Sequence, residues 1–200
     1  MESDQPNESK ENNIRQLITQ LEQIKGEHVG KESGPFDYTN DRESYLYVSA
    51  MKEAVSKSTA PLKVAVIVNH GSLWSVGKEL SGVDILIRLD RDNVQLEHDK
   101  KRRQQILKAS SPGDLLPQPN PTVDMQDLVQ ANKERYRLSS PNVEKEALDK
   151  YWYLSSDKSL QETKDFLGRD NIAFVNGDLG DNEFMGNLGR VLKEFGAKVV

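Results

Sequence analysis

The chain contains no cysteine, which excludes disulfide bonds, thiolate zinc sites and cysteine nucleophiles. Its 3 histidines are scattered without the spacing of metal-ligand pairs, so the sequence predicts no metal site. No apolar run approaches the ~20 residues that a membrane-spanning helix needs. The N-terminus, MESDQPNESKENN, lacks the basic start and apolar stretch of a signal peptide. These absences predict a cytoplasmic protein without membrane contact, and export by a route that reads no N-terminal signal is compatible with them.

What the chain does contain fits one domain of ordinary size. It has 200 residues, 36% of them hydrophobic, which is enough to bury a core. The net charge of -5 argues against a surface built for nucleic-acid phosphates. A basic run at residues 100–103, KKRR, is either a local patch for an acidic partner or a solvated helix face.

The N-terminal third predicts a polar tail followed by helices. Residues 1–12 are nearly all polar and are expected to be disordered, because they offer no apolar surface to bury. Residues 13–58 form a predicted helical region. In it, NIRQLITQLEQIK has apolar side chains at helical spacing, and a second helix is expected from Asp41 to Ser58.

The remainder, residues 59–200, alternates between strand and helix patterns. Apolar runs predict strands at 63–68, 83–89, 172–176 and 197–200, and amphipathic segments predict helices at 95–108, 159–167 and 182–195. Nearly continuous apolar strands are typical of a parallel sheet covered on both faces. The sequence therefore predicts an α/β, Rossmann-like, doubly wound and mostly parallel sheet with helices on both faces.

A long insertion interrupts this alternation at about residues 109–150. The segment SSPGDLLPQPNPTVD holds four of the 8 prolines in the chain, which predicts an irregular loop. The distance between the second and third predicted strands is also much longer than a simple crossover requires.

Polar residues and glycines follow the first predicted strand. The segment Asn69-His70-Gly71-Ser72 ends that strand, and a glycine there permits a sharp turn and close approach of a ligand. The helix expected after it would present unpaired N–H groups to an anionic or polar ligand. A turn without any ligand is the alternative. His70 is either a polar loop residue or a general base, and Trp74 is expected to pack in the core.

Acidic side chains follow the next two predicted strands. Asp90 ends the second strand about twenty residues after the glycine turn, where dinucleotide-binding folds hydrogen-bond ribose hydroxyls, and Asp92 is the alternate. Gly177 and Asp178 end the third strand, where a carboxylate can accept from the amine of an adenine. Carboxyl ends of parallel strands share the edge of the sheet where ligands bind. Alternatively, the aspartates are solvated charges, and Asp178 or Asp181 caps the next helix.

The segments VAVIVNHGSLWSVG, DILIRLDRD and IAFVNGDLGD, in that order, resemble the class I S-adenosylmethionine-dependent methyltransferases over roughly residues 40–200. The resemblance implies S-adenosylmethionine as cofactor, with its methionine part near Asn69 and Gly71, its ribose on Asp90 and its adenine at Gly177 and Asp178. The first turn departs from the family, which has closely spaced glycines after an acidic residue. No catalytic residue can be carried over, because the family's substrate-positioning residues follow the fourth strand, where this sequence ends.

Two other functions stay open beside a methyltransferase-like domain whose methyl acceptor is unknown. The departures at the glycine turn favour a non-catalytic α/β module that binds a protein partner and has lost the cofactor site. A Rossmann domain for another nucleotide, such as NAD, is the third hypothesis, although GxGxxG is absent. The sheet is expected to be incomplete, as in a fragment or a shortened relative. We therefore expect self-association through the open edge at the terminal AKVV.

Overall fold

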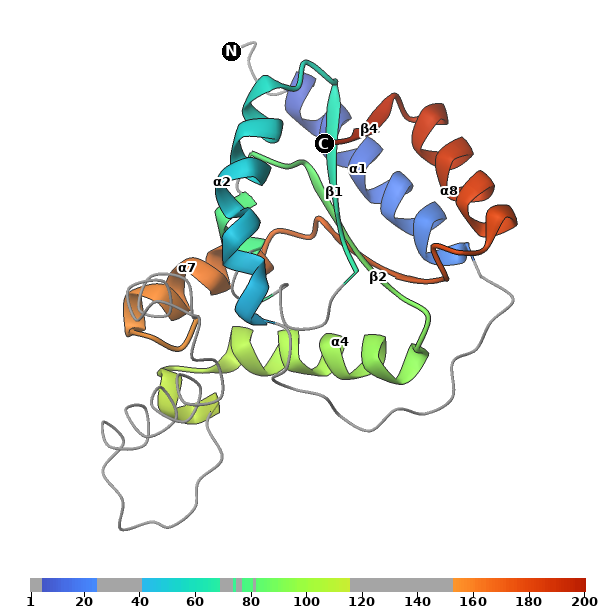
Figure 1. The fold of residues 1–200 in the computed structure, drawn as a ribbon. Coiled ribbons are helices and arrows are strands. Elements are labelled where there is room, and N and C mark those ends of the chain that lie inside the picture. The colour runs from blue at the N-terminus through green and yellow to red at the C-terminus, as the bar shows by residue number, and fades with distance from the viewer. Residues whose placement is uncertain (1–4, 25–40, 69–73, 75–76, 81, 116–152) are drawn as a thin grey trace.

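The computed structural model describes residues 5–24, 41–68, 74, 77–80, 82–115 and 153–200 (Figure 1). The elements in chain order are α1 Gln5–Gln23, α2 Asp41–Lys57, β1 Leu62–Ile67, the 3-10 helix η1 Gly77–Leu80, β2 Ile85–Asp90, α4 Asn93–Lys108, the 3-10 helix η2 Pro112–Leu115, α7 Asp157–Leu167, β3 Ile172–Asn176, α8 Asn182–Glu194 and β4 Ala197–Val199.

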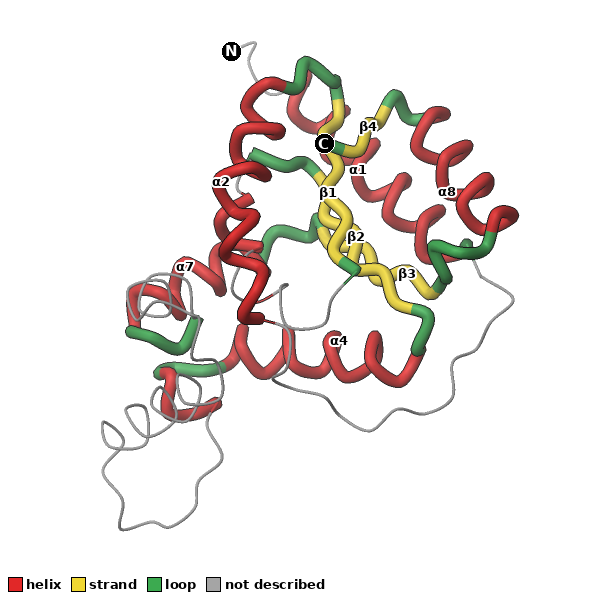
Figure 2. Tube along the Cα trace, in the orientation of Figure 1, coloured by secondary structure: helices red, strands yellow, loops and turns green. Residues whose placement is uncertain are grey.

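These strands form one parallel sheet in the order β3-β2-β1-β4 (Figure 2). Val64 of β1 pairs with Ile85 of β2 on one side and with Val199 of β4 on the other. From β1, the sheet extends through β2 to β3 on one side and to β4 on the other. This order matches the first four strands of the Rossmann order 3-2-1-4-5-6. The predicted α/β, Rossmann-like fold with a parallel sheet is confirmed.

Helices cover both faces of the sheet, and each face has its own core. Helices α1 and α8 lie side by side over one face, whereas α2, α4 and α7 lie over the other (Figure 1). We call the first the α8-face core; its buried members are Leu17, Leu21, Leu62, Val64, Ile85, Ile87, Leu89, Ala173, Val175, Phe184, Leu188 and Leu192. Because side chains of a strand alternate between faces, the intervening residues of β1, β2 and β3 face the other helices.

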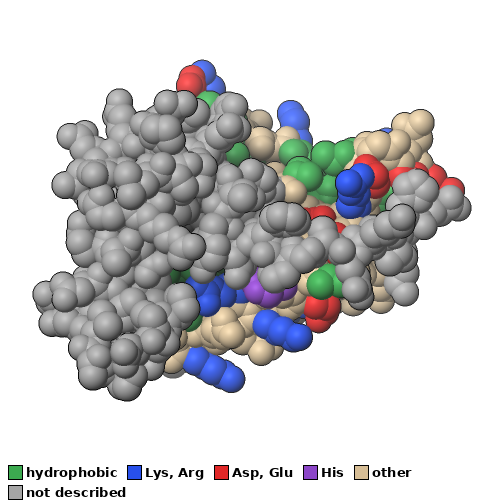
Figure 3. All heavy atoms as spheres, turned by 60° about the horizontal axis from the view of Figure 1, so that its bottom comes forward, with side chains coloured by type: hydrophobic (Ala, Val, Ile, Leu, Met, Phe, Trp, Pro, Cys, Tyr) green, Lys and Arg blue, Asp and Glu red, His purple; other side chains and the backbone are tan. Residues whose placement is uncertain are grey.

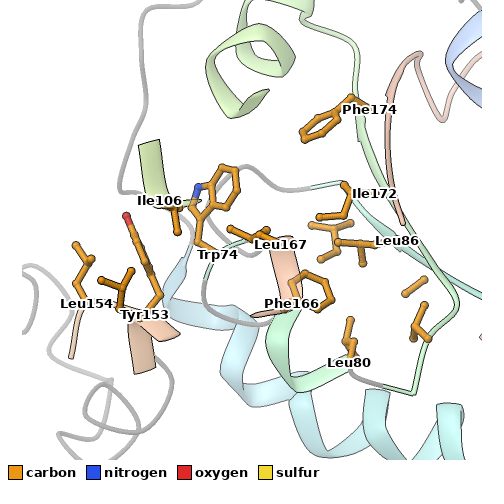
Figure 4. Packing of buried hydrophobic residues seen from close by; sticks show 14 of the residues in the cluster. Trp74, Leu80, Leu86, Ile106, Tyr153, Leu154, Phe166, Leu167, Ile172 and Phe174 are labelled. Atoms are coloured by element: carbon orange, nitrogen blue, oxygen red, sulfur yellow. The ribbon is translucent and has the colours of Figure 1, made fainter. Parts of the chain in front are cut away.

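The second core, which we call the α4-face core, joins α4 and α7 to the sheet. Figure 4 shows its packing, in which Phe166 and Leu167 of α7 lie beside Leu86 of β2 and Ile172 of β3. Trp74 is 5% exposed and belongs to this core, which confirms the packing role expected for it.

The first helix begins earlier than the sequence pattern indicates. Helix α1 starts at Gln5, so residues 5–12 are helical rather than part of a disordered tail. Pro6 lies in the first turn, where its missing N–H and fixed φ are tolerated. Lys10 then forms an ion pair with Asp84, at 2.7 Å, which ties this polar segment to the amino end of β2. This ion pair is a tertiary contact that hydrophobic periodicity does not indicate.

Only part of the predicted insertion falls within the described residues. Residues 110–115 form a bend and the 3-10 helix η2, in which Asp114 accepts hydrogen bonds from the backbone N–H groups of Ser110 and Ser111. The rest of the insertion lies outside the described residues.

Candidate functional site

Three of the five predicted cofactor-binding residues meet at the carboxyl edge of the sheet. Asp90 is the last residue of β2, and it pairs with Asn176, the last residue of β3. The N–H of Gly177 donates to the carbonyl of Asp90 at 2.9 Å, and Asp178 follows directly. The other two predicted residues, Asn69 and Gly71, lie outside the described residues, as does His70.

The carboxylate of Asp90 is held at both oxygens. Its Oδ2 accepts from Nη2 of Arg88 at 2.8 Å, and its Oδ1 accepts from the backbone N–H of Asp92 at 3.0 Å. The side chain is still 20% exposed. Since a carboxylate has about four lone-pair sites, this geometry leaves acceptor capacity toward solvent at the edge where ligands of such sheets bind.

Arg88 belongs to the site although it was not predicted as a site residue. Its side chain is fully buried. Its Nε donates to Oδ2 of Asp99 at 2.7 Å, and the Asp99 side chain is also 0% exposed. Its Nη1 donates to the carbonyl oxygens of Leu89 at 2.6 Å and Val68 at 3.4 Å. We refer to Arg88, Asp90 and Asp99 as the ionic cluster.

The ionic cluster was not predicted from the sequence, although the sequence carries a signal for it. Arg88 stands within the run ILIRLD, in a strand predicted to be buried on both faces. A charge in such a strand needs a partner, because an unpaired buried charge is very costly. Asp99 lies in the following helix, and only the packing of α4 on the sheet brings it to Arg88.

Asn176 fixes the end of β2 relative to β3. Its side-chain Nδ2 lies 3.2 Å from the carbonyl oxygens of both Asp90 and Arg91. Together with the N–H of Gly177, it holds the backbone of Asp90, while Arg88 and Asp92 hold the side chain. The candidate ribose acceptor is thus fixed before any ligand arrives.

Gly177 lies against an aromatic ring. A Cβ added to this residue would stand 2.2 Å from Cε2 and Cζ of Phe184, which is 1% exposed in the α8-face core. The absence of a side chain at this position is therefore explained by helix packing. A contact between Gly177 and a cofactor stays a prediction.

The two aspartates after β3 have different local roles. Asp181 is the N-cap of α8, where its Oδ1 accepts from the N–H groups of Glu183 and Phe184. The Oδ1 of Asp178 accepts from the N–H of Gly180 at 2.8 Å, within the turn before the helix. Asp181 therefore caps α8, and Asp178 stays available as the predicted adenine contact.

The aspartate after β2 also begins a helix. Asp92 is the N-cap of α4 and accepts from the N–H of Val94 at 2.9 Å. It is 6% exposed, so Asp90 is the better placed of the two for a ligand at this edge.

Members of the basic run at residues 100–103 make several different contacts within the chain. Arg103 donates through Nε and Nη2 to the carbonyl of Leu167 at the end of α7, and Arg102 donates to Tyr153 and Leu115. Lys100 bonds to Glu97. Figure 3, which brings the lower end of Figure 1 forward, shows several basic side chains on this face, some of them near a histidine. The interpretation of this run as a helix surface agrees with these contacts.

No protein-family model and no curated protein sequence matches this chain. Within the described ranges, no group of three or more histidine and acidic side chains could hold a metal ion. In the same ranges, no helix is long and apolar enough to cross a membrane.

Proposed function

We propose that the chain binds an adenosyl nucleotide, with S-adenosylmethionine as the candidate, at the carboxyl edge of β1, β2 and β3. One observation carries the proposal: Asp90 ends β2 of a parallel sheet with a Rossmann-like strand order, and its oriented carboxylate is partly exposed. Asp90 would accept hydrogen bonds from the ribose hydroxyls, and Asp178 would accept from the adenine amine. We assign no methyl acceptor and no catalytic residue.

The test is calorimetric titration of the folded chain with S-adenosylhomocysteine. We expect binding, and we expect Asp90→Ala to weaken it by about tens to several hundredfold, because hydrogen bonds to a charged acceptor are lost. The absence of heat at millimolar ligand would overturn the proposal.

Asp84 provides a matched control at the opposite end of β2. Like Asp90, it pairs with a cation, Lys10 at 2.7 Å, and accepts from a backbone N–H, that of Lys63 at 2.7 Å. Its side chain is 18% exposed, close to the 20% of Asp90. Asp84→Ala should therefore lose comparable local contacts without changing the affinity. An equal loss of affinity in both variants would mean that the ligand does not contact Asp90.

A non-catalytic interaction module is the second candidate, and a specific observation favours it. Both oxygens of Asp90 already have partners within the chain, and Gly177 is explained by packing on Phe184. A thermal-shift panel of S-adenosylhomocysteine, NAD and NADP separates the hypotheses. Stabilisation by NAD alone would favour another Rossmann ligand, and stabilisation by none of them would favour the module.

A further inference from the structure

Stability alone does not explain why the guanidinium of Arg88 is buried. Replacing a buried ion pair by apolar side chains of similar volume is often neutral or stabilising. The neighbouring positions of β2, Ile87 and Leu89, are apolar and equally buried. An apolar side chain at residue 88 would therefore have been sufficient for packing alone.

The contacts of Arg88 leave its guanidinium a single orientation. Asp99 holds Nε from α4, and the carbonyl of Leu89 holds Nη1 from β2 itself. The remaining nitrogen, Nη2, is thereby directed at Oδ2 of Asp90. An anchored planar fork of this kind fixes the position of a carboxylate better than a flexible ammonium would.

We infer that Arg88, anchored from the core by Asp99, is a positioning residue that fixes the carboxylate of Asp90 for the hydroxyls of a ribose. Arg88 itself is fully buried and does not reach the ligand. It acts by removing the rotational freedom that Asp90 would otherwise lose on binding, which is the usual gain from preorganisation. The inference rests on the proposed function, because it requires that Asp90 bind the ribose.

A binding cycle with S-adenosylhomocysteine tests this role. Arg88→Lys keeps the charge and removes the fork, and we expect it to weaken binding about tenfold, within the range of coupling between contacting residues. In the background of Asp90→Ala, the same substitution should change the affinity by less than about twofold, because its only route to the ligand is gone. Asp99→Asn is the second variant, and it should show the same dependence on Asp90.

Leu96→Ala controls for a general loss of packing. Leu96 lies on α4 and is 1% exposed in the α4-face core, but it is not part of the ionic cluster. At a temperature where every variant is folded, Leu96→Ala should bind as the wild type does.

The outcomes separate the inference from the proposed function. If the wild type binds and Asp90→Ala weakens binding, but Arg88→Lys and Asp99→Asn bind normally, the inference alone is overturned. The inference is also overturned if Arg88→Lys weakens binding equally in the wild-type and Asp90→Ala backgrounds. It is likewise overturned if Leu96→Ala weakens binding as much as Arg88→Lys does. If the wild type does not bind S-adenosylhomocysteine at all, the proposed function fails and the inference fails with it.

Discussion

Ile87 and Arg88 are neighbours in β2, and both are fully buried, yet they are buried in opposite ways. Ile87 points into the α8-face core, where every buried member is apolar. Arg88 points toward α4, where its burial depends on Asp99, Asp90 and backbone carbonyl groups. The buried interior of the α8 face is held by area removed from water, whereas the buried interior of the α4 face near the carboxyl edge also needs directed contacts.

The contrast indicates that a functional site is to be sought on the α4 face, near the carboxyl edge of the sheet. Apolar contacts are non-directional, so the α8 face can tolerate substitutions that keep its volume. The ionic cluster requires defined positions of α4 relative to β2, and it includes the one partly exposed carboxylate that ends β2. Substitutions on each face can test whether the two faces differ in this way.

The largest effect is expected from breaking the ionic cluster on one side. Asp99→Ala leaves the guanidinium of Arg88 with one fewer charged partner in the core, which should cost about 3–5 kcal/mol in the free energy of unfolding. Urea denaturation measures it. Combining Arg88→Met with Asp99→Leu should recover stability to within about 1 kcal/mol of the wild type, because a buried ion pair can be replaced by apolar groups.

That double variant would give the α4 face the apolar character of the α8 face. We expect it to fold and to bind S-adenosylhomocysteine more weakly than the wild type. If the double variant is as unstable as Asp99→Ala, the ionic cluster serves to stabilise the fold. The α4 and α8 faces then differ less in function than we propose.

The next effect concerns the α8 face and the turn that leads into it. Gly177→Ala places a Cβ against the ring of Phe184, and overpacking of this kind should cost about 1–3 kcal/mol. Thermal unfolding measures the loss. In a Phe184→Leu background the same substitution should cost less, because the ring that it meets is absent.

Gly189→Ala is the matched control for that substitution. It makes the same chemical change within α8, at a position where an added Cβ would meet nothing within 4 Å. It should stabilise the protein by about 0.5–1 kcal/mol, since alanine is the better helix former. A loss of stability in both variants would mean that α8 does not pack as described.

A smaller effect, similar on both faces, should follow from removing the helix caps. Asp92→Ala on α4 and Asp181→Ala on α8 should each cost about 1 kcal/mol, because each removes a side-chain acceptor from the first turn. Asp178→Ala should cost less than about 0.5 kcal/mol, because Asp178 is a partly exposed turn residue that caps no helix. If Asp178→Ala lowered the stability more than Asp181→Ala did, Asp178 and not Asp181 would be the cap of α8.

The smallest effect is a pH dependence far from the ionic cluster. Hydrogen bonds from the backbone N–H groups of Ser110 and Ser111 lower the pKa of Asp114. Its stabilising contribution is therefore present at neutral pH and is lost as the pH falls below about 4 through the lower pKa of the folded state. Asp114→Asn should be slightly less stable than the wild type at pH 7. The two proteins should converge in acid, and an unchanged difference down to pH 2 would contradict this assignment.

The sequence predicted the elements wherever local pattern was strong. The predicted strand at Ile172–Asn176 agrees with β3 in both of its ends, and the helix expected from Asp41 differs from α2 only in its last residue. The start of α1 was predicted too late, because residues 5–12 have no apolar periodicity. Their helix is associated with a tertiary ion pair between Lys10 and Asp84.

The candidate site was only partly predictable for a related reason. Asp90 could be found because strand ends in an α/β alternation fall on one edge of the sheet. Asn176 was predicted as the end of a strand, but its contact with two carbonyl groups of β2 depends on which strands are neighbours. Gly177 drew attention as a glycine at a strand end, and its contact with Phe184 emerged only from the packing of α8.

The α/β alternation, the buried strands and the aspartates at their ends could be predicted from hydrophobic periodicity along the chain. The place of β2 between β1 and β3, the packing of α4 over Arg88 and the pairing of Asp99 with Arg88 could not. Periodicity is a property of neighbouring residues, whereas an ion pair between a strand and the helix packed on it forms only once both are in place.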